Sequence, residues 1–408
     1  MRSVAEFYQD CLAASAQQPP LDLLLGDAMG CVLAEDVIAP FSHPVTDVAA
    51  CDGYAVSSRD LALASSATPT RLMVTSEIGA GSTEVEALVP GSAIRIASGA
   101  PMPIGADAVA PLDISDLGTA VVNLSGCVGP GDNVRARGED FQEGTTILES
   151  GSRLTPAKIA ALAAVGRERV VVHPQPRVVI LSVGDELVEP GVKAAPGTVF
   201  DANGHMLAAA VAELGVEAYR VSAVPDERQR LRDVVEDQLM RADIIIPTGG
   251  LSFGSADTVR EVFGALGKVR FDNVAAWPGH MLGVGTVPTD RGSDVPVFAL
   301  PGDPVAAQVC FEVYVRPALR KMQGEKQINR SAVKGQVDYG WDSPLGHREF
   351  VRVKLQGSPR SGYRAQVMGR PDKLWLSALA SSNALAIVPE DVTRVNAGDE
   401  LTCLLLEQ

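Results

Sequence analysis

The residues best suited to chemistry in this chain lie in two glycine-rich turns, each preceded by a short apolar run. Residues 242–254 read ADIIIPTGGLSFG, and residues 297–305 read VFALPGDPV. Glycine lets a ligand approach bare backbone, and a helix that begins after such a turn offers unpaired N–H groups to an anion. Two such turns in one region predict a binding cleft at the carboxyl ends of parallel strands. The candidate ligand-binding residues in these turns are Gly249, Gly250, Ser252, Gly254, Pro301, Gly302 and Asp303.

Both turns belong to a stretch, residues 176–322, in which strand-like and helical patterns alternate. Strands are expected at 177–182, 218–223, 243–247 and 297–300, and helices at 204–214, 227–239, 256–266 and 305–319. Strands that alternate with helices of this length predict a doubly wound α/β domain.

The parts that flank this domain carry other patterns. Residues 1–40, including 21–25 and 28–34, have the spaced apolar residues of helices, and a further helix is expected between Pro156 and Gly166. Two segments are rich in strand-like runs, which lie at 71–74, 93–97 and 120–124 and at 331–337, 350–355, 384–388 and 400–405.

A multi-domain α/β plus β protein follows from these patterns. Residues 1–44 plus 139–172 are expected to form a helical/β N-terminal body for linkage and dimerisation, into which a β-rich domain of residues 45–138 is inserted. The α/β domain would span residues 173–325, and a small C-terminal β-barrel domain would span residues 326–408.

Composition excludes several classes of function. The 408 residues carry a formal net charge of −15, which argues against binding to nucleic acid or to anionic lipid. No apolar run approaches a membrane span and the N-terminus lacks a signal-peptide pattern, so we expect a cytoplasmic protein without direct membrane insertion. The six cysteines lack a C-x-x-C pair and the five histidines lack ligand spacing, which argues against disulfides and structural zinc.

Nine short segments occur in a specific order along nearly the whole chain. They read VLAEDV (32–37), CDGYAV (51–56), RIASGAPMP (95–103), GADAV (105–109), NVRARGED (133–140), ILSVGDEL (180–187), DANG (201–204), TGGLSFG (248–254) and LPGDPV (300–305). In these segments the chain resembles the gephyrin/MoeA family of molybdopterin molybdenumtransferases, as a divergent bacterial member. The shared order carries the resemblance, since no single segment is specific.

The resemblance implies a fold, a reaction and a partner. It implies a homodimer whose cleft lies where the α/β domain meets the partner subunit. In that cleft adenylylated molybdopterin would react with molybdate, assisted by a divalent metal such as Mg²⁺. Molybdenum enters the dithiolene and AMP leaves.

The resemblance also carries site residues onto this sequence. The catalytic acids would be Asp52, Glu186, Asp226 and Asp257, and three of them, Asp52, Glu186 and Asp257, would bind the metal. Ser98 stands where the family has a threonine that contacts ligand, and it keeps the hydroxyl. Structural readings stay open for two of the acids: Asp52 before Gly53 is also typical of a turn, and Asp257 of a partner for a helix dipole.

Positive charge is where the chain departs from the family. The family usually has lysine at three positions that here hold Asn273, Trp277 and His280, it has asparagine where this chain has Asp303, and a family Gly-Ser pair reads Asp372-Lys373. Each lost charge-assisted hydrogen bond weakens anion binding by about 1.5–3 kcal/mol. We therefore hypothesise weak or altered catalysis, with compensation by Arg260 or Lys373 left open.

A second function remains open at this point. Gephyrin uses the same fold as a scaffold, gripping a membrane-receptor peptide in the groove between the α/β and C-terminal domains and contacting the tubulin cytoskeleton. In this chain Tyr339, Trp341 and Trp375 are the candidate partner-binding residues, although most aromatic residues in strands belong to a core. By analogy the partner would be a membrane-receptor tail or a tubulin-like division GTPase; a third reading is a protein that holds molybdopterin without turnover.

Overall fold

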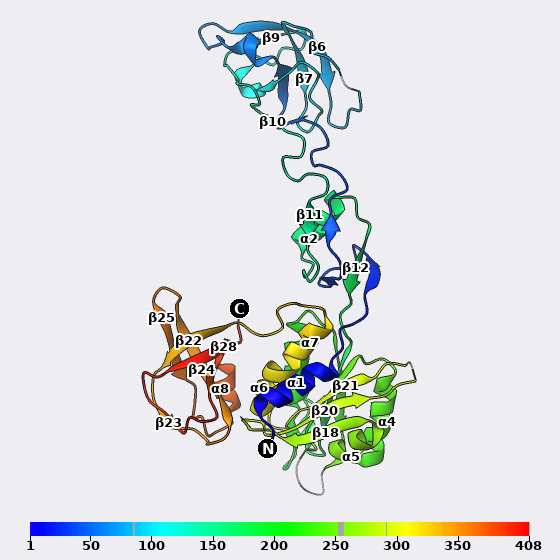
Figure 1. Cartoon of the computed structure of the whole chain (residues 1–408), viewed down its shortest axis with the longest axis vertical. Coiled ribbons are helices and arrows are strands. Elements are labelled where there is room, and N and C mark those ends of the chain that lie inside the picture. Colours follow the sequence, from blue (N-terminus) through cyan, green and yellow to red (C-terminus); the bar gives the residue numbers. More distant parts are fainter. Residues whose placement is uncertain (85, 252–256, 291, 408) are drawn as a thin grey trace. The chain divides into compact units, whose positions relative to one another are not determined.

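The computed structural model describes residues 1–84, 86–251, 257–290 and 292–407 (Figure 1). The chain divides into two compact units. Unit 1 comprises Met1–Ala34, Gly151–Thr155 and Arg169–Gln408, and unit 2 comprises Glu35–Ser150 and Pro156–Glu168. In the described residues no helix is both long and apolar enough to cross a membrane.

Unit 2 is built on a five-stranded sheet with the order β8-β5-β7-β6-β9. Its strands are β5 (Gly53–Val56), β6 (Thr70–Ile78), β7 (Ser92–Ile96), β8 (Ala108–Pro111) and β9 (Val121–Leu124). The remaining elements are β3 (Val37–Ile38), β4 (Val48–Ala49), η1 (Ser58–Leu61), η2 (Leu112–Ile114), β10 (Val134–Arg135), β11 (Thr146–Leu148) and α2 (Pro156–Ala164). The predicted strands at 71–74, 93–97 and 120–124 and the predicted helix after Pro156 are confirmed.

The α/β domain of unit 1 contains a six-stranded mixed sheet with the order β16-β13-β17-β21-β20-β18. Four strands run parallel, namely β13 (Val178–Val183), β16 (Ala218–Val224), β17 (Ile244–Thr248) and β21 (Val295–Ala299). Two antiparallel strands, β18 (Lys268–Asn273) and β20 (Met281–Val287), extend the sheet at one edge. The doubly wound domain predicted from the sequence is confirmed, and the antiparallel edge is an addition to it.

The sequence pattern does not predict β20 as a strand, because this segment contains glycines and glycine is depleted in ordinary strands. The sheet itself requires them. A Cβ on Gly285 would lie 2.0 Å from the carbonyl oxygen of Lys268, and one on Gly283 would lie 2.6 Å from the ring of Phe271. Close packing of β18 against β20 therefore depends on these two positions having no side chain.

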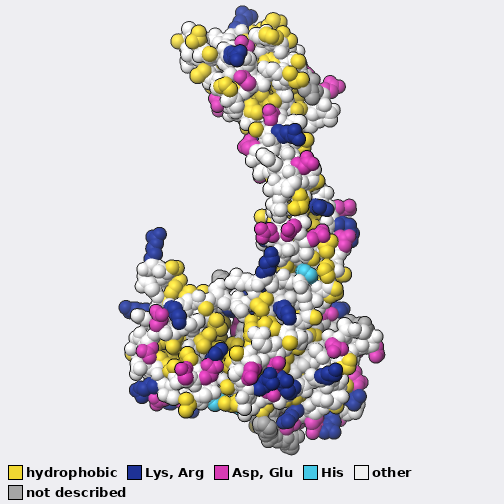
Figure 2. All heavy atoms as spheres, viewed as in Figure 1, with side chains coloured by type: hydrophobic (Ala, Val, Ile, Leu, Met, Phe, Trp, Pro, Cys, Tyr) yellow, Lys and Arg dark blue, Asp and Glu magenta, His cyan; other side chains and the backbone are white. Residues whose placement is uncertain are grey.

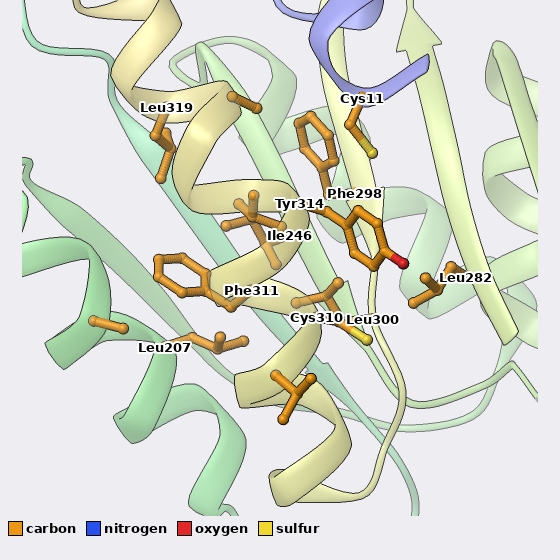
Figure 3. Close-up of a cluster of buried hydrophobic side chains, with 14 of the residues drawn as sticks. Cys11, Leu207, Ile246, Leu282, Phe298, Leu300, Cys310, Phe311, Tyr314 and Leu319 are labelled. Atoms are coloured by element: carbon orange, nitrogen blue, oxygen red, sulfur yellow. The ribbon is translucent and has the colours of Figure 1, made fainter. Parts of the chain in front are cut away.

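Helices cover both faces of the sheet. On one face lie α1 (Val4–Ala14), α3 (Ala202–Ala212), and α6 (Pro304–Cys310), which continues through the π-helical turn η3 (Phe311–Val315) into α7 (Arg316–Met322). Figure 3 shows side chains from these helices, including Leu207 and Tyr314, gathered over Ile246 and Phe298 of the sheet. On the other face α4 (Arg228–Leu239) and α5 (Thr258–Leu266) pack on a second apolar cluster.

The prediction of helix for residues 21–34 is wrong. Here β1 (Leu21–Leu24) and β2 (Val32–Leu33) pair with the two edges of β12 (Arg169–His173) in an antiparallel sheet. Leucines suit either structure, and pairing with a distant strand decides the outcome. The leucines at the two ends of β1 are exposed. Their spacing is therefore not that of apolar residues on the buried face of a helix.

The C-terminal domain is the predicted β-barrel. Its strands β24 (Arg348–Ser358), β25 (Gly362–Val367), β22 (Ala332–Val337), β28 (Glu400–Leu405) and β26 (Ala384–Val388) are neighbours in that order, and β26 pairs back to β24. The short strand β19 (Ala276–Trp277) leaves the α/β domain and joins β24 in parallel. Smaller elements complete unit 1: β14 (Leu187–Val188), β15 (Val199–Phe200), β23 (Trp341–Asp342), α8 (Leu376–Ala380) and β27 (Arg394–Val395).

A buried ion pair fastens the linker between the α/β domain and the barrel. Arg330 of the linker donates from Nε to Oε2 of Glu312 at 2.6 Å and from Nη2 to Oε1 at 3.0 Å. Their side chains are 3% and 2% exposed, and Glu213 accepts a further bond from Arg330 at 3.2 Å. On the face shown in Figure 2, by contrast, acidic and basic side chains are interspersed over the surface.

Replacing Arg330 with methionine is expected to destabilise unit 1 by about 3 kcal/mol, because it leaves the buried Glu312 carboxylate with only the Gln308 amide at 3.1 Å and the Arg316 guanidinium at 3.9 Å. Arg394→Met is the matched control, since Arg394 and Asp342 are 68% and 82% exposed and such a pair contributes at most about 1 kcal/mol. Urea-induced unfolding followed by circular dichroism measures both variants. Equal unfolding midpoints for the two would show that the buried pair does not stabilise the junction.

Candidate functional site

The two glycine-rich turns meet in one pocket at the carboxyl ends of the parallel strands. The pocket has a volume of about 650 Å³. Gly249 and Gly250 enter it after β17, and Pro301, Gly302 and Asp303 enter it after β21. The Gly249 N–H donates to the carbonyl of Leu300 at 3.3 Å, which joins the first turn to the second.

Close approach explains why the first turn needs glycine, whereas Gly302 in the second turn has room for a Cβ at ordinary van der Waals distance. Gly249 and Gly250 have φ angles of +84° and +59°, which side chains rarely adopt. A Cβ on Gly249 would lie 2.3 Å from the carbonyl oxygen of Val183, and one on Gly302 would lie 3.5 Å from the Gly249 Cα. The turns therefore offer a ligand backbone rather than side chains.

Carboxylates line one side of this pocket. Glu186 and Asp226 are among its lining residues, and the Asp226 N–H donates to Oδ1 of Asp185 at 3.0 Å. Burial raises the pKa of Asp226, and the charges of Asp185 and Glu186 raise it further. The described lining residues thus include the acids Glu186, Asp226 and Asp303 and no lysine or arginine.

Two carboxylate oxygens near this position lack partners. Oδ1 of Asp226 and Oδ1 of Asp257 are buried and make no hydrogen bond, and Asp257 begins α5 without capping it through its side chain. Crowded acids with unpartnered oxygens have the chemistry of a divalent-cation site. Within the described ranges, however, no three His, Cys, Asp or Glu side chains are grouped closely enough to hold a metal by themselves.

Asp303 occupies the start of α6 with its own side chain. Its Oδ1 accepts from the N–H groups of Val305 at 2.9 Å and Ala306 at 3.0 Å. These amides are therefore engaged within the protein, and an anion cannot use them unless Asp303 moves. The charges of Glu349 and Asp303 oppose the lowering of the Arg352 pKa that burial causes, so Asp303 lies within the field of a buried cation.

The C-terminal domain contributes Leu374 to the described lining of the pocket. The backbone before Leu374 is held in place by two side chains. Trp277 Nε1 donates to the carbonyl of Pro371 at 3.3 Å, and Arg352 Nη2 donates to the carbonyls of residues 370 and 373 at 2.8 Å each. The pocket is therefore completed by a fixed segment of the barrel domain.

Positive side chains are missing from this pocket. Its described lining residues include no lysine or arginine. Trp277 and His280 both line it, whereas Asn273 is exposed at the end of β18 and is not among the lining residues. Of the three positions where the family usually has lysine, two therefore line the pocket and one does not.

Asp52 and Ser98 lie in unit 2, where they form a local pair. Ser98 N–H donates to Oδ1 of Asp52 at 2.7 Å, and the Ser98 hydroxyl donates to the Ala50 carbonyl at 3.2 Å. Glu186, Asp226 and Asp257 lie in unit 1. A metal site that combines Asp52 with Glu186 and Asp257 stays a prediction, and the candidates Ser252 and Gly254 fall outside the described residues.

Trp341, a predicted partner-binding residue, is largely buried in this structure. It is 8% exposed in the barrel core, where its Nε1 donates to Glu349 at 2.9 Å. Tyr339 and Trp375 are 37% and 48% exposed. The Tyr339 hydroxyl donates to the Gly369 carbonyl at 3.0 Å, and a Cβ on Gly369 would lie 2.9 Å from the Trp375 ring, so both aromatic residues flank Gly369.

Sequence reasoning missed Asn203 as a pocket residue. Its Nδ2 donates to the Gly302 carbonyl at 2.8 Å, and its Oδ1 is buried without a partner. Asp201 accepts from the Gly204 N–H at 2.9 Å and caps α3, which places Asn203 in the first turn of that helix. The segment DANG (201–204) could have indicated this residue, since an aspartate that caps a helix sets the position of the side chains that follow it.

Comparisons with known proteins match the chain over its whole length. The family model of the MoeA N-terminal region (domain I and II) matches residues 2–166, a probable molybdopterin binding domain matches 179–321 and the MoeA C-terminal region (domain IV) matches 334–406. Molybdopterin molybdenumtransferase 2 of Mycobacterium tuberculosis is 37% identical over 98% of each chain, and molybdopterin molybdenumtransferase 1 of that organism is 34% identical over 100% of each. A molybdopterin biosynthesis MoeA protein from Pyrococcus horikosii has a similar structure, with a TM-score of 0.80 and 28% identity over 100% of this chain and 99% of that one.

Replacing Asp226 with asparagine is expected to raise the thermal unfolding temperature at pH 7 in buffer with EDTA. Because the pKa of Asp226 is raised above 3.8, the folded chain binds its proton more tightly than the unfolded chain does. This stabilisation is complete below pH 3.8 and is lost as pH rises through the raised pKa, so the advantage of the neutral variant appears above that window and shrinks below it. Differential scanning calorimetry from pH 4 to 8 measures the difference.

Glu189→Gln provides a control of opposite sign. The Arg220 guanidinium lowers the pKa of Glu189, so this variant should be less stable than the wild type at pH 7, and the difference should shrink as pH falls. If both variants shifted in the same direction with pH, the account of charge crowding at Asp226 would be contradicted.

Proposed function

The chain belongs to the MoeA family of molybdopterin molybdenumtransferases, and from this premise we propose that its α/β-domain pocket binds adenylylated molybdopterin. The function is that of a molybdopterin molybdenumtransferase in molybdenum cofactor biosynthesis. In the proposed reaction molybdate delivers molybdenum to the dithiolene of the pterin, and AMP leaves.

One observation carries the proposal: the turns after β17 and β21 meet in a single pocket that acids also line. The backbone at Gly249, Gly250 and Gly302 offers a phosphate-linked ligand a surface free of side chains. A pocket of about 650 Å³ falls within the range of sites that enclose a small organic ligand. The phosphates of the substrate would contact this backbone, and its planar ring would lie in the rest of the pocket.

The acids give the metal requirement of the proposal a physical basis. Mg²⁺ is usually held by one or two protein carboxylates together with water and substrate phosphates, so the absence of a three-ligand group among the described residues is no obstacle to it. Asp226 and Glu186, which line the pocket, would hold the ion, with Asp257 as a further candidate. The unpartnered oxygens of Asp226 and Asp257 fit this role. When bound, Mg²⁺ would neutralise charge on the phosphates and polarise their oxygens.

The part of unit 2 in the reaction also belongs to the proposal. Asp52 is a further candidate acid, and Ser98 a candidate ligand contact, in a homodimer. This chain has Asn273, Trp277 and His280 where the family usually has lysine. The loss of positive charge at these positions supports the hypothesis that anion binding is weak without metal. With two of these side chains lining the pocket and no lysine or arginine among its described lining residues, the ion and the backbone would supply the attraction.

Release of AMP tests the function directly. The full-length chain is incubated with adenylylated molybdopterin and molybdate, with Mg²⁺ or with EDTA, and AMP is quantified by chromatography. We expect AMP release to require both molybdate and Mg²⁺, and to fall at least about tenfold in Asp226→Asn, because an ionic ligand to the metal is lost.

Asp342→Asn is the matched control, since the Asp342 side chain is 82% exposed in the barrel domain. Absence of AMP release from the folded wild type would contradict the proposed function. A rate as high as that of the Mycobacterium tuberculosis relatives would instead refute the hypothesis of weakened catalysis and leave the function intact.

A second candidate function is peptide binding by the barrel domain, as in a scaffold. The favouring observation is that Tyr339, Trp375 and Leu376 are 37%, 48% and 46% exposed. An exposed apolar and aromatic surface of this kind suits a peptide anchor. The partner would be a membrane-receptor tail or a tubulin-like division GTPase.

Isothermal titration with a peptide from such a receptor tail or from the GTPase C-terminus tests this function. Binding should weaken at least about tenfold in Trp375→Ser, because aromatic anchors dominate peptide interfaces, while Met240→Ser, at an exposed apolar residue (71%) outside the barrel, should leave it unchanged. Equal affinities for wild type and Trp375→Ser would remove the surface from consideration.

A further inference from the structure

Trp277 is a large aromatic residue in the wall of the pocket. It ends the short strand β19, which pairs with β24 of the barrel, and its Nε1 donates to the Pro371 carbonyl at 3.3 Å. The side chain is only partly buried. The indole is therefore held at its strand and at its nitrogen while part of its surface faces the pocket.

The surroundings of Trp277 favour a flat heterocycle over a bare anion. Leu251, Met281 and Leu374 contribute apolar lining, and this environment suits the faces of an aromatic ring. Glu186 and Asp226 contribute carboxylates, which repel phosphate but accept hydrogen bonds from ring N–H and amino groups. No lysine or arginine stands among the described lining residues to favour the phosphate instead.

Stacking on an indole does not depend on charge. An aromatic side chain stacked on a nucleic-acid base changes affinity by about 5- to 100-fold when it is removed. The substrate of the proposed reaction contains two planar heterocycles that carry amino groups, adenine and pterin. Either one could use Trp277 as a stacking surface.

We propose that the indole of Trp277 stacks on the planar heteroaromatic ring of the substrate, so that this chain selects and orients an anionic substrate by its ring. The proposal rests on the proposed function, because it names a specificity-determining residue of the same pocket. Trp277 is then a binding residue, and its hydrogen bond to Pro371 keeps the stacking surface fixed before the ligand arrives. This pre-organisation limits the entropy lost on binding.

Three variants separate the ring from its hydrogen bond. Trp277→Phe keeps an aromatic ring and loses Nε1, and Trp277→Leu loses both. Trp375→Phe alters an exposed tryptophan that follows the lining residue Leu374 and is not itself among the described lining residues. The full-length variants, with folding checked by circular dichroism, are titrated calorimetrically in Mg²⁺ with three probes: AMP, 6-hydroxymethylpterin and ribose 5-phosphate. Ribose 5-phosphate carries the anion without an aromatic ring.

Stacking predicts that Trp277→Leu binds the ring that faces Trp277 about 5- to 100-fold more weakly than the wild type does. Trp277→Phe should stay within about threefold of the wild type, and ribose 5-phosphate should bind all variants alike. A loss with AMP assigns adenine to Trp277, and a loss with 6-hydroxymethylpterin assigns pterin. Quenching of tryptophan fluorescence by the same probe, in Trp375→Phe but not in Trp277→Phe, gives a spectroscopic sign of contact.

Two results would overturn the proposal. Equal losses in Trp277→Phe and Trp277→Leu would show that the bond to Pro371 acts and the ring does not, and unchanged affinities, or no binding of either ring, would show that nothing stacks there. In both cases AMP release from adenylylated molybdopterin by the wild type would leave the proposed function standing. Failure of that release would count against the function separately.

Discussion

The site depends on one constraint, the close approach of two backbone turns at the ends of β17 and β21. A Cβ on Gly249 would collide with the Val183 carbonyl, and Gly302 lies directly against Gly249. Because Gly249 cannot carry a side chain without movement, the pocket floor at the first turn is backbone, and Gly302 adds backbone at the second turn. Asn203 completes the arrangement by donating to the Gly302 carbonyl, so the geometry is set by α3 as well as by the two turns.

Electrostatics then decide what this floor can hold. Asp303 satisfies the first amides of α6 with its own carboxylate. Burial raises the pKa of Asp226, and the charges of Asp185 and Glu186 raise it further. A phosphate that enters such a pocket needs a counter-charge from a metal ion or an attraction that is independent of charge. The proposed Mg²⁺ on Asp226 and the proposed stacking on Trp277 meet these two needs through different parts of one substrate.

Much of the architecture could be predicted from the sequence, because the parallel strands are continuous apolar runs with helices between them. The glycine turns could be placed in one cleft for the same reason. β20 could not, since Gly283 and Gly285 make it read as a loop until their packing against β18 is known. For β1, the pairing with β12 overrode a leucine pattern, and for Trp341, burial against Glu349 could not be told from exposure by residue type. Leu374 could not be predicted as a lining residue, because hydrogen bonds from the distant residues Trp277 and Arg352 hold the barrel segment beside the pocket.

The central claim is that the pocket holds an anionic substrate through backbone, metal and ring contacts without a cationic side chain. A crystal structure of the chain with adenylylated molybdopterin and Mg²⁺ tests it most directly. The account predicts phosphate oxygens against the backbone at Gly249 and Gly302, the ion on Asp226, and a heterocycle over Trp277. A substrate whose phosphates are bound by lysine or arginine side chains away from these turns would contradict it.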